Sequence, residues 1–215
     1  MEMFSKFVEY GLNQAVGFAV GALASFWASI RFTKWWSKRH YKQYGSLVGT
    51  WIEANDLLTD RPFSVCSFFF SDSDGKLKLS GDSFDNQADV FYRWWSVILH
   101  IDDRERRMSY VYETQRVGDT KKDEGFGCYT LHLNTTKNRW DIVRGYFQDL
   151  NEARPRHCKL IRFEEVAAYL KRQLDPSSDK DQRLVVKELL KYKDDPEIRS
   201  LFGWKQQDAT GDTHG

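Results

Sequence analysis

Cysteine is scarce in this sequence, and the few cysteines follow no recognisable spacing. Three cysteines at irregular spacing indicate neither a disulfide framework nor a zinc site. The histidines show no metal-ligand spacing either, and adjacent residues of a strand, such as His157 and Cys158, point to opposite faces. We therefore predict no metal and no cofactor. The residues considered are Cys66, Cys128, Cys158, His40, His100, His132, His157 and His214.

Catalytic motifs are missing as well. The sequence contains no Walker A loop, no GxSxG elbow and no HExxH zinc motif. The segment Asp72-Ser-Asp-Gly75 looks like part of a calcium loop, but a glycine at the sixth loop position would place Gly81 where the ligating glutamate belongs. We predict a hairpin turn there, and we predict that the protein is not an enzyme.

An excess of charge of one sign is also absent. The formal net charge is only +1, so the chain lacks the basic character of a domain that binds DNA or RNA duplexes. The partners that we predict are instead a small ligand, a lipid bilayer and further copies of the chain.

Charge is missing altogether from residues 10–30, and residues 15–30 are the most apolar part of that stretch. A helix of this length would extend about 32 Å, enough to cross a hydrocarbon layer of about 30 Å. The chain as a whole is polar, with a mean hydropathy of -0.62. We predict a single transmembrane helix. A signal peptide cleaved after Ala22-Leu23-Ala24 is the alternative, but the apolar run continues beyond that site.

The charges on either side of the run predict its orientation. Basic residues are concentrated after it, and basic residues favour the cytoplasmic side. We therefore expect residues 1–42 to form an anchor with a basic juxtamembrane segment, placed in the cell inner membrane with the N-terminus outside and the rest in the cytoplasm. The basic residues are Arg31, Lys34, Lys38, Arg39 and Lys42.

Small and polar residues recur every four positions along this helix. Such a ridge lets helices approach closely and hydrogen-bond, which predicts self-association through it. The alternative is that small residues are simply common in membrane spans. The ridge consists of Asn13, Gly17, Gly21, Ser25 and Ser29.

The segment from residue 45 to residue 163 has the pattern of a β domain. Short stretches rich in aromatic and β-branched residues alternate with turn signals. Eight strands with short connections favour an up-and-down barrel, which leaves no free edge; a β-sandwich is the alternative. The predicted strands are residues 45–54, 62–71, 75–84, 89–101, 106–116, 125–134, 139–147 and 157–163.

A Gly-x-Trp sequence stands in the first strand, at Gly49 and Trp51, and Arg162 stands in the last. Residues 164–174 then have the pattern of an amphipathic helix. This arrangement resembles the lipocalin-like, or calycin, barrels. The resemblance implies that Trp51 closes the barrel floor and that Arg162 packs across it, within a compact sensor domain over residues 43–174.

A membrane span followed by a compact calycin-like barrel resembles a further group, the membrane-anchored β-barrel effectors of bacterial anti-phage signalling (CBASS-type, prokaryotic STING-like barrels). The resemblance covers roughly residues 7–163 and rests on architecture. Members of that group usually carry two spans, whereas this sequence shows one. The resemblance implies that the barrel binds a cyclic nucleotide, that binding drives oligomerisation of the transmembrane helices, and that the inner membrane is disrupted.

Two segments follow the barrel. Residues 175–204 have the pattern of short amphipathic helices, which either pack on the outside of the barrel or hold a partner. Residues 205–215 show no periodicity, and we predict a disordered tail.

A nucleotide site would combine aromatic rings, which stack on bases, with arginine, which pairs with phosphate. Strand alternation places Trp140, Ile142, Arg144 and Tyr146 on one face, where Arg144 would need an anionic partner. The alternative is that the rings form the core and that Arg93 and Arg144 face solvent. The candidate ligand-binding residues are Arg93, Trp94, Tyr110, Tyr112, Trp140, Arg144 and Tyr146.

The sequence thus leaves three functions open. The first is a membrane effector gated by a cyclic nucleotide. The second is a membrane-tethered lipocalin-like carrier of a small apolar ligand. The third is a membrane scaffold without a ligand, in which side chains fill the barrel.

Overall fold

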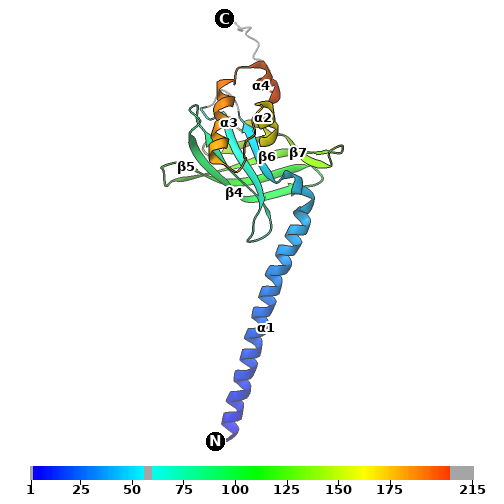
Figure 1. Cartoon of the computed structure of the whole chain (residues 1–215). Coiled ribbons are helices and arrows are strands. Elements are labelled where there is room, and N and C mark those ends of the chain that lie inside the picture. The colour runs from blue at the N-terminus through cyan, green and yellow to red at the C-terminus, as the bar shows by residue number, and fades with distance from the viewer. Residues whose placement is uncertain (1, 56–59, 204–215) are drawn as a thin grey trace. The chain divides into compact units, whose positions relative to one another are not determined.

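The computed structural model describes residues 2–55 and 60–203, and for residues 2–19 and 38 it describes the backbone only. After a long helix, eight antiparallel strands form a closed barrel in sequence order, and three short helices follow (Figure 1). The elements are α1 (Glu2–Tyr41), a 3-10 turn (Lys42–Leu47), β1 (Gly49–Ala54), β2 (Phe63–Phe70), β3 (Leu77–Phe84), β4 (Val90–Asp102), β5 (Arg107–Arg116), β6 (Lys122–Asn134), β7 (Arg139–Asp149), β8 (Arg156–Arg162), α2 (Phe163–Tyr169), α3 (Asp179–Lys191) and α4 (Pro196–Leu201).

The predicted barrel is confirmed, and the sandwich is wrong. Strand β1 pairs with β2 on one side and with β8 on the other, so the sheet closes on itself. The strand positions agree with the sequence pattern to within a few residues, because turn residues separate the strands clearly. At the β2–β3 connection, for example, Gly75 adopts a φ of 69° and the Gly75 N–H donates to the Ser71 carbonyl.

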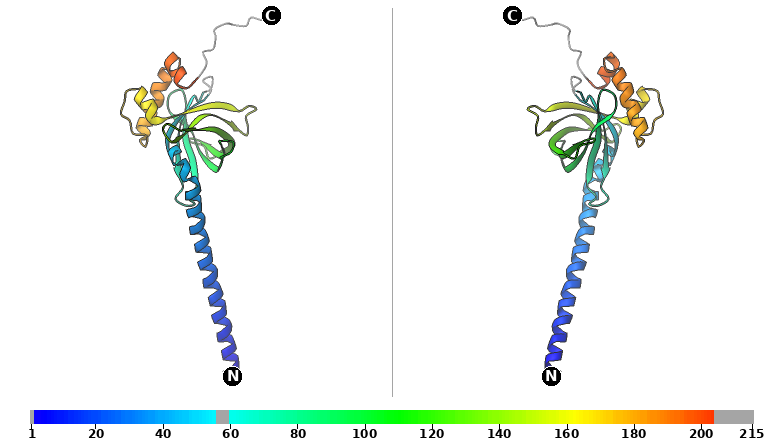
Figure 2. Two further views of the ribbon diagram at one scale, coloured as in Figure 1. Left: turned by 90° about the vertical axis from the view of Figure 1, so that its right-hand side faces the viewer. Right: turned by 90° about the vertical axis from the view of Figure 1, so that its left-hand side faces the viewer.

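The burial patterns of the strands show which side of the barrel is covered. Residues of β5 alternate between buried and exposed, as expected for a strand with one face in solvent. Residues of β1 are buried on both faces. The second layer over β1 is formed by α2–α4, which Figure 2 shows grouped on one side of the barrel.

Helices α2–α4 share a hydrophobic core with the outward side chains of β1, β2 and β8. For residues 175–204 the sequence leaves two possibilities open, packing on the outside of the barrel or holding a partner. In the structure α3 and α4 contribute to this core, as packing on the barrel requires. Residues 204–215, including the predicted disordered tail, lie outside the described residues. Fully buried members of this core include Ile52, Phe63, Phe163, Val166, Val185, Val186 and Leu189.

Helix α1 covers the stretch predicted to cross a membrane, and with the turn Phe70–Lys76 it forms a compact unit distinct from the barrel and C-terminal helices. Within the residues that the structure describes, no helix is both long enough and apolar enough for a membrane span. Large apolar side chains of α1 are nevertheless exposed, including Phe26, Trp27, Phe32 and Trp36, each 59–63% exposed.

Glycines in the barrel wall make room for aromatic rings. In each of four cross-strand pairs, a glycine lies opposite a ring that fills the interior, and a Cβ on the glycine would come within 2.2–2.8 Å of that ring. A larger residue would therefore push the ring out of place. The pairs are Gly81 with Trp94, Gly125 with Tyr112, Gly127 with Tyr110, and Gly145 with Tyr129.

Candidate functional site

A small cavity lies inside the barrel, and residues from seven of its eight strands line it. Its volume is about 30 Å³, room for one or two water molecules. Side chains therefore fill most of the barrel interior. The lining residues are Glu53, Asn55, Arg61, Ser64, Ser83, Tyr92, Trp94, Tyr110, Tyr112, Thr114, Phe147, Asp149 and Arg156.

A buried carboxyl group forms one wall of the cavity. Glu53 is 3% exposed, and the hydroxyl of Tyr129 donates to Glu53 Oε1 at 3.0 Å. The hydroxyl of Tyr110 donates to that of Tyr129 at 2.9 Å, which makes a chain of hydrogen bonds ending at Glu53. Burial raises the pKa of Glu53, and the hydrogen bonds from Cys158 and Tyr129 oppose this only in part. The cavity wall thus contains a carboxyl group that is harder to ionise than one in water.

The thiols and phenols near Glu53 are held in their protonated forms. Burial, followed by the charge of Glu53, raises the pKa of Cys66, Cys158 and Tyr110 well above the usual range. A thiol of this kind is a poor nucleophile, because the thiolate is the reactive form. All three groups pack in the interior, and Tyr110 and Cys158 also donate hydrogen bonds.

Asn55 is the second buried acceptor in the cavity wall. It is 3% exposed, and its Nδ2 donates to the Arg61 carbonyl at 3.2 Å. Its Oδ1 is buried and has no hydrogen-bond partner within the described part of the chain. Buried polar atoms are nearly always paired, so a donor from outside the protein would find an acceptor ready here.

Aromatic rings surround these acceptors. The rings of Tyr110 and Tyr112 lie 5.8 Å apart, and that of Trp94 lies 6.4 Å and 6.1 Å from them, respectively. The Tyr112 hydroxyl donates to Asp149 Oδ1 at 2.5 Å. Burial and the charge of Asp149 both raise the pKa of Tyr112. The rings form an ordered apolar wall with a few polar groups between them, as ligand pockets commonly do.

Two arginines also line the cavity, and both already have partners. The Arg61 guanidinium lies 4.7 Å from the ring centre of Tyr92 and 3.6 Å from a Glu152 oxygen. Arg156 Nε donates to Glu152 Oε2 at 2.8 Å. Glu152 thus holds both guanidinium groups, and an anionic ligand would have to compete with its carboxylate.

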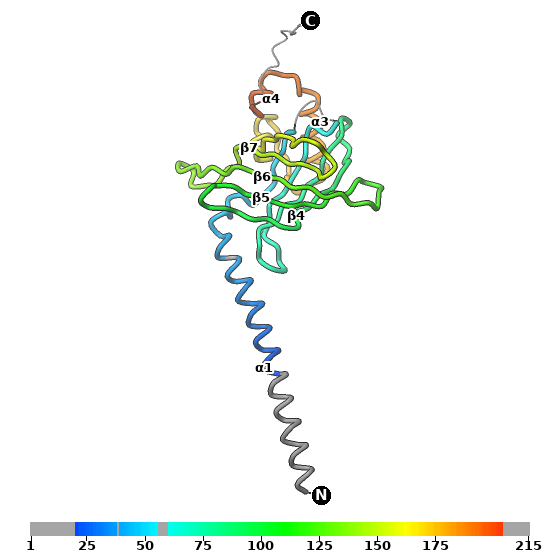
Figure 3. Tube along the Cα trace, turned by 180° about the vertical axis from the view of Figure 1, so that it is seen from behind, coloured from blue at the N-terminus to red at the C-terminus, as the bar shows by residue number. Residues whose placement is uncertain are grey.

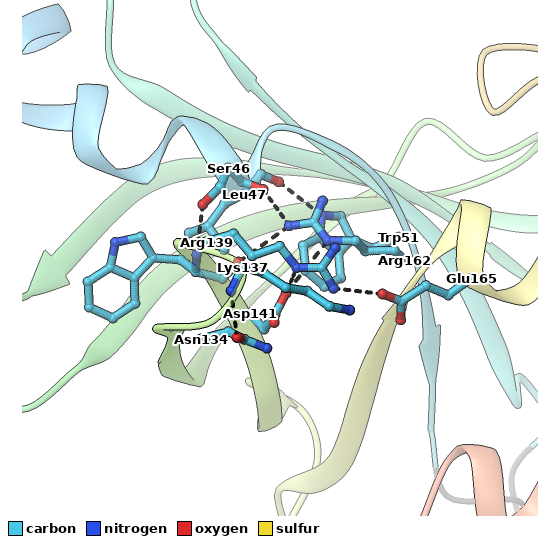
Figure 4. A network of polar contacts seen from close by, with 10 residues as sticks. Ser46, Leu47, Trp51, Asn134, Lys137, Arg139, Asp141, Arg162 and Glu165 are labelled. Atoms are coloured by element: carbon cyan, nitrogen blue, oxygen red, sulfur yellow. Dashed lines mark hydrogen bonds and ion pairs between the residues drawn. The ribbon is translucent and has the colours of Figure 1, made fainter.

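Trp51 of the Gly-x-Trp sequence and Arg162 lie together at the β1–β8 junction (Figure 4). The Arg162 guanidinium lies 4.2 Å from the ring centre of Trp51. It donates to the Ser46 carbonyl and, at 3.3 Å, to that of Trp140. The Trp51 Nε1–H donates to the Leu47 carbonyl at 2.9 Å. This cluster ties the chain before β1 to the barrel wall.

Acidic side chains extend the cluster to the first helix after the barrel. Arg139 Nη2 donates to Glu165 Oε1 of α2 at 2.7 Å, and Arg139 Nε lies 3.0 Å from Asp141 Oδ1 (Figure 4). Arg162 Nε lies 3.7 Å from the same Asp141 oxygen. The cluster thereby links β7, β8 and α2.

The structure separates the predicted ligand-binding residues into two groups. Trp94, Tyr110 and Tyr112 line the cavity together, and Tyr110 and Tyr112 share one face of β5 as predicted. Arg93 lies outside the barrel with its Nε 3.7 Å from Asp82 Oδ1, and Trp140 packs on Tyr44 with 5.4 Å between ring centres.

The predicted shared face of Trp140, Ile142, Arg144 and Tyr146 is wrong. The β6–β7 register shifts, so that Thr130 pairs with Arg144 and Leu131 with Ile142, and Val143 is the extra residue of a β-bulge. The bulge reverses the alternation. Ile142 stays buried while Arg144 and Tyr146 face outward, so Arg144 needs no buried anionic partner.

The predicted ridge of α1 is described only in part. The side chains of Asn13 and Gly17 lie outside the described residues. No atom would come within 4 Å of a Cβ on Gly21, and Ser25 and Ser29 are exposed. The described half of the ridge is thus an open surface.

Sequence reasoning missed Glu53, Asn55 and the wall glycines. The positions Glu53 and Asn55 alternate with Ile52 and Ala54 directly after Trp51, which was a signal for inward-facing polar residues. In the described part of the chain, no group of three or more His, Cys, Asp or Glu residues could hold a metal ion.

Fold and site together define a closed eight-stranded β-barrel with a small, partly polar interior cavity. Comparison with models of protein families, with curated proteins and with solved structures finds no match.

Proposed function

We propose that the barrel is a sensor that binds a small molecule through its interior cavity. The observation that carries this proposal is the buried Asn55 Oδ1, which has no hydrogen-bond donor among the described residues and belongs to a side chain that lines the aromatic cavity. A ligand with an N–H group and a flat ring would satisfy that acceptor and stack on the neighbouring rings.

A cyclic nucleotide is the ligand class that we propose. A nucleobase offers both a flat ring and N–H donors, and stacking on an aromatic side chain contributes about 1–3 kcal/mol per base. Asn55 and Glu53 would accept hydrogen bonds from the base, and Arg61 and Arg156 would exchange Glu152 for the phosphates. The present cavity has room for only one or two water molecules, so binding requires that lining side chains such as Tyr92 and Arg61 move.

We further propose that α1 attaches the barrel to the inner membrane and that ligand binding clusters α1 through the Gly17, Gly21, Ser25 and Ser29 side. The uncharged stretch over residues 10–30 and the exposed Trp27, Phe32 and Trp36 of α1 support attachment to a lipid surface. The resemblance to anti-phage effectors supplies the consequence, which is disruption of the inner membrane in antiviral defence.

A scaffold without a ligand is the second candidate, because a cavity of about 30 Å³ is nearly full. The carrier of an apolar ligand has less support, since the lining includes Glu53, Asn55, Ser64, Ser83 and Thr114. An apolar molecule over Asn55 would leave its Oδ1, which has no partner among the described residues, without a hydrogen bond, and this is costly.

The proposal is tested in cells that express the full chain together with a cyclic-nucleotide synthase, with uptake of a membrane-impermeant dye as the readout. Asn55→Leu should abolish dye uptake and nucleotide binding, whereas Asn151→Leu, an exposed asparagine in the β7–β8 turn, should change neither. Gly17→Leu with Gly21→Leu should abolish dye uptake alone, and Ala19→Leu, on the opposite side of the helix, should not.

Two outcomes contradict the proposal in different ways. Unchanged nucleotide binding by Asn55→Leu would remove the cavity as the ligand site. Dye uptake that survives Gly17→Leu with Gly21→Leu would remove clustering through the small-residue side of α1.

A further inference from the structure

A groove on the outside of the barrel has a volume of about 910 Å³. It is lined by residues 143–144 of β7, residues 152–159 of the β7–β8 turn and β8, and residues 202–203 after α4, and is here called the β7–β8 groove. Figure 3, seen from behind Figure 1, shows α4 above β7. The volume lies within the range of sites for small organic ligands, about 300–1,000 Å³, whereas the interior cavity holds about 30 Å³.

The strand register explains why the barrel wall is hollowed here. Within residues 139–162, all of which the structure describes, β7 and β8 pair only through residues 145–147 and 156–158. The bulge at Val143 bends β7, while the rest of β8 pairs with β1 on its other side. The groove lies where the two strands separate. A Cβ on Gly203 would lie 3.2 Å from Lys159 Nζ, so the glycine leaves room for the lysine amine at the edge of the groove.

Basic side chains line the groove. Arg144, Arg154 and His157 are exposed, and none of them forms an ion pair within the described part of the chain. Lys159 Nζ donates to the Leu201 carbonyl at 3.0 Å, which leaves two of its three N–H groups for a ligand.

Glu152 is the one acidic side chain in this lining, which the structure describes in full, and it is already paired. Arg156 Nε donates to Glu152 Oε2 at 2.8 Å, and Arg61 Nη2 lies 3.6 Å from Glu152 Oε1. These two guanidinium groups also line the interior cavity. The carboxylate therefore does not neutralise the other basic residues of the groove, which carries an excess of positive charge.

Uncharged side chains stand among the basic ones. Val143, Ala153 and Pro155 are exposed in the lining and offer contact to a carbon skeleton. Arginine pairs with oxyanions through two parallel hydrogen bonds, and a phosphate group carries a charge of about −1.5 to −2, more than a carboxylate does. Several cations around one concave groove therefore fit an organic molecule with more than one phosphate group.

We propose that the β7–β8 groove is a binding site for a soluble organic molecule that carries two or more phosphate groups. Arg144, Arg154 and Lys159 bind the phosphates, and Val143 and Pro155 contact the rest of the molecule. The ligand is soluble, because these residues surround a concave groove rather than a flat face. The inference goes beyond the proposed function and needs neither Asn55 nor a base in the interior cavity.

The first test is isothermal titration calorimetry of the full chain in detergent, with tripolyphosphate as the probe. Added KCl should weaken binding, because salt screens ionic interactions. Arg144→Ser with Arg154→Ser should lower the affinity about a hundredfold, since each hydrogen-bonded charge contributes about tenfold. The control Arg104→Ser with Lys137→Ser removes the same charge from exposed residues of the β4–β5 and β6–β7 turns and should leave the affinity unchanged. Thermal melting checks that each variant is folded.

The second test separates the classes of ligand and the two sites. ATP, which adds an organic group to a triphosphate, should bind at least as tightly as tripolyphosphate. Poly-glutamate in solution and phosphatidylglycerol in the detergent micelles should not displace the probe. Asn55→Leu should bind tripolyphosphate like the original chain, so that a failure of the proposed sensor function leaves this result intact.

Equal affinity of the original chain and Arg144→Ser with Arg154→Ser would overturn the proposal. Displacement of the probe by poly-glutamate or by phosphatidylglycerol would overturn it by showing an acidic peptide or a lipid as the partner. Loss of binding in Asn55→Leu would place the probe in the interior cavity instead. Binding that appears only after residues 204–215 are deleted would show that this segment of the chain occupies the groove, and would overturn the proposal as well.

Discussion

Glu53→Gln should make the stability of this protein less dependent on pH. Burial raises the pKa of Glu53 above its value of 4.5 in the unfolded chain. Between the unfolded and folded pKa values, the folded state therefore binds more protons than the unfolded state, and the free energy of unfolding falls as pH rises. The slope for one group is about 1.4 kcal/mol per pH unit, or about 3–5 °C in Tm for a chain of this size.

The assay is thermal melting of the full chain from pH 4 to pH 8. The amide introduced by Glu53→Gln keeps an oxygen for the Tyr129 hydroxyl but does not titrate. The variant should match the original chain below pH 4.5 and become increasingly more stable above it, up to the folded pKa of Glu53. Glu105→Gln, at an exposed turn position, is the matched control and should leave the profile unchanged. Parallel pH profiles for the original chain and Glu53→Gln would refute the reasoning about the buried carboxyl group.

Three further changes test the fold. Gly127→Ala places a Cβ 2.3 Å from Tyr110 Cζ and should lower the free energy of unfolding by about 1–3 kcal/mol. The control Gly45→Ala, with no atom within 4 Å of its Cβ, should change that free energy by less than about 0.5 kcal/mol. Equal effects of the two changes in denaturant titration would contradict the ring–glycine pairing. Arg162→Ala should lower the free energy of unfolding by about 2–3 kcal/mol, because its hydrogen bonds to backbone carbonyls are lost. Arg162→Lys should recover little of this stability, because lysine lacks the planar guanidinium group. Full recovery in the same titration would show that charge alone matters. Leu189→Ala should lower the free energy of unfolding by about 2–5 kcal/mol. Leu150, whose side chain is 63% exposed, is the control, and Leu150→Ala should lower it much less. A tolerated Leu189→Ala would mean that α3 does not share a hydrophobic core with the outer face of the barrel.

The barrel could be predicted from the sequence because its signals are local. Turn residues mark nearly every strand end, and Met108, Tyr110 and Tyr112 alternate cleanly on β5. The resemblance to calycin barrels implied that Arg162 packs across Trp51, and the structure places the Arg162 guanidinium 4.2 Å from the centre of the Trp51 ring.

The site was harder to predict because it depends on register. A bulge at Val143 shifts the alternation by one residue and turns Arg144 outward, and no local sequence signal marks it. Glu53 and Asn55 looked like ordinary polar residues of a strand. The alternation after Trp51 indicates that they face inward, but their place in the cavity wall depends on the C-terminal helices that cover Ile52 and Ala54.

The measurement that tests the sensor most directly is thermal melting of the full chain against a panel of cyclic di- and trinucleotides, with Asn55→Leu beside it. A nucleotide at 100 times its dissociation constant adds about 2.7 kcal/mol, which corresponds to a rise in Tm of about 5–10 °C. A nucleotide sensor should show such a rise for one member or a few members of the panel, and Asn55→Leu should lose it. An unchanged Tm across the whole panel, or a rise that Asn55→Leu retains in full, would contradict the sensor function.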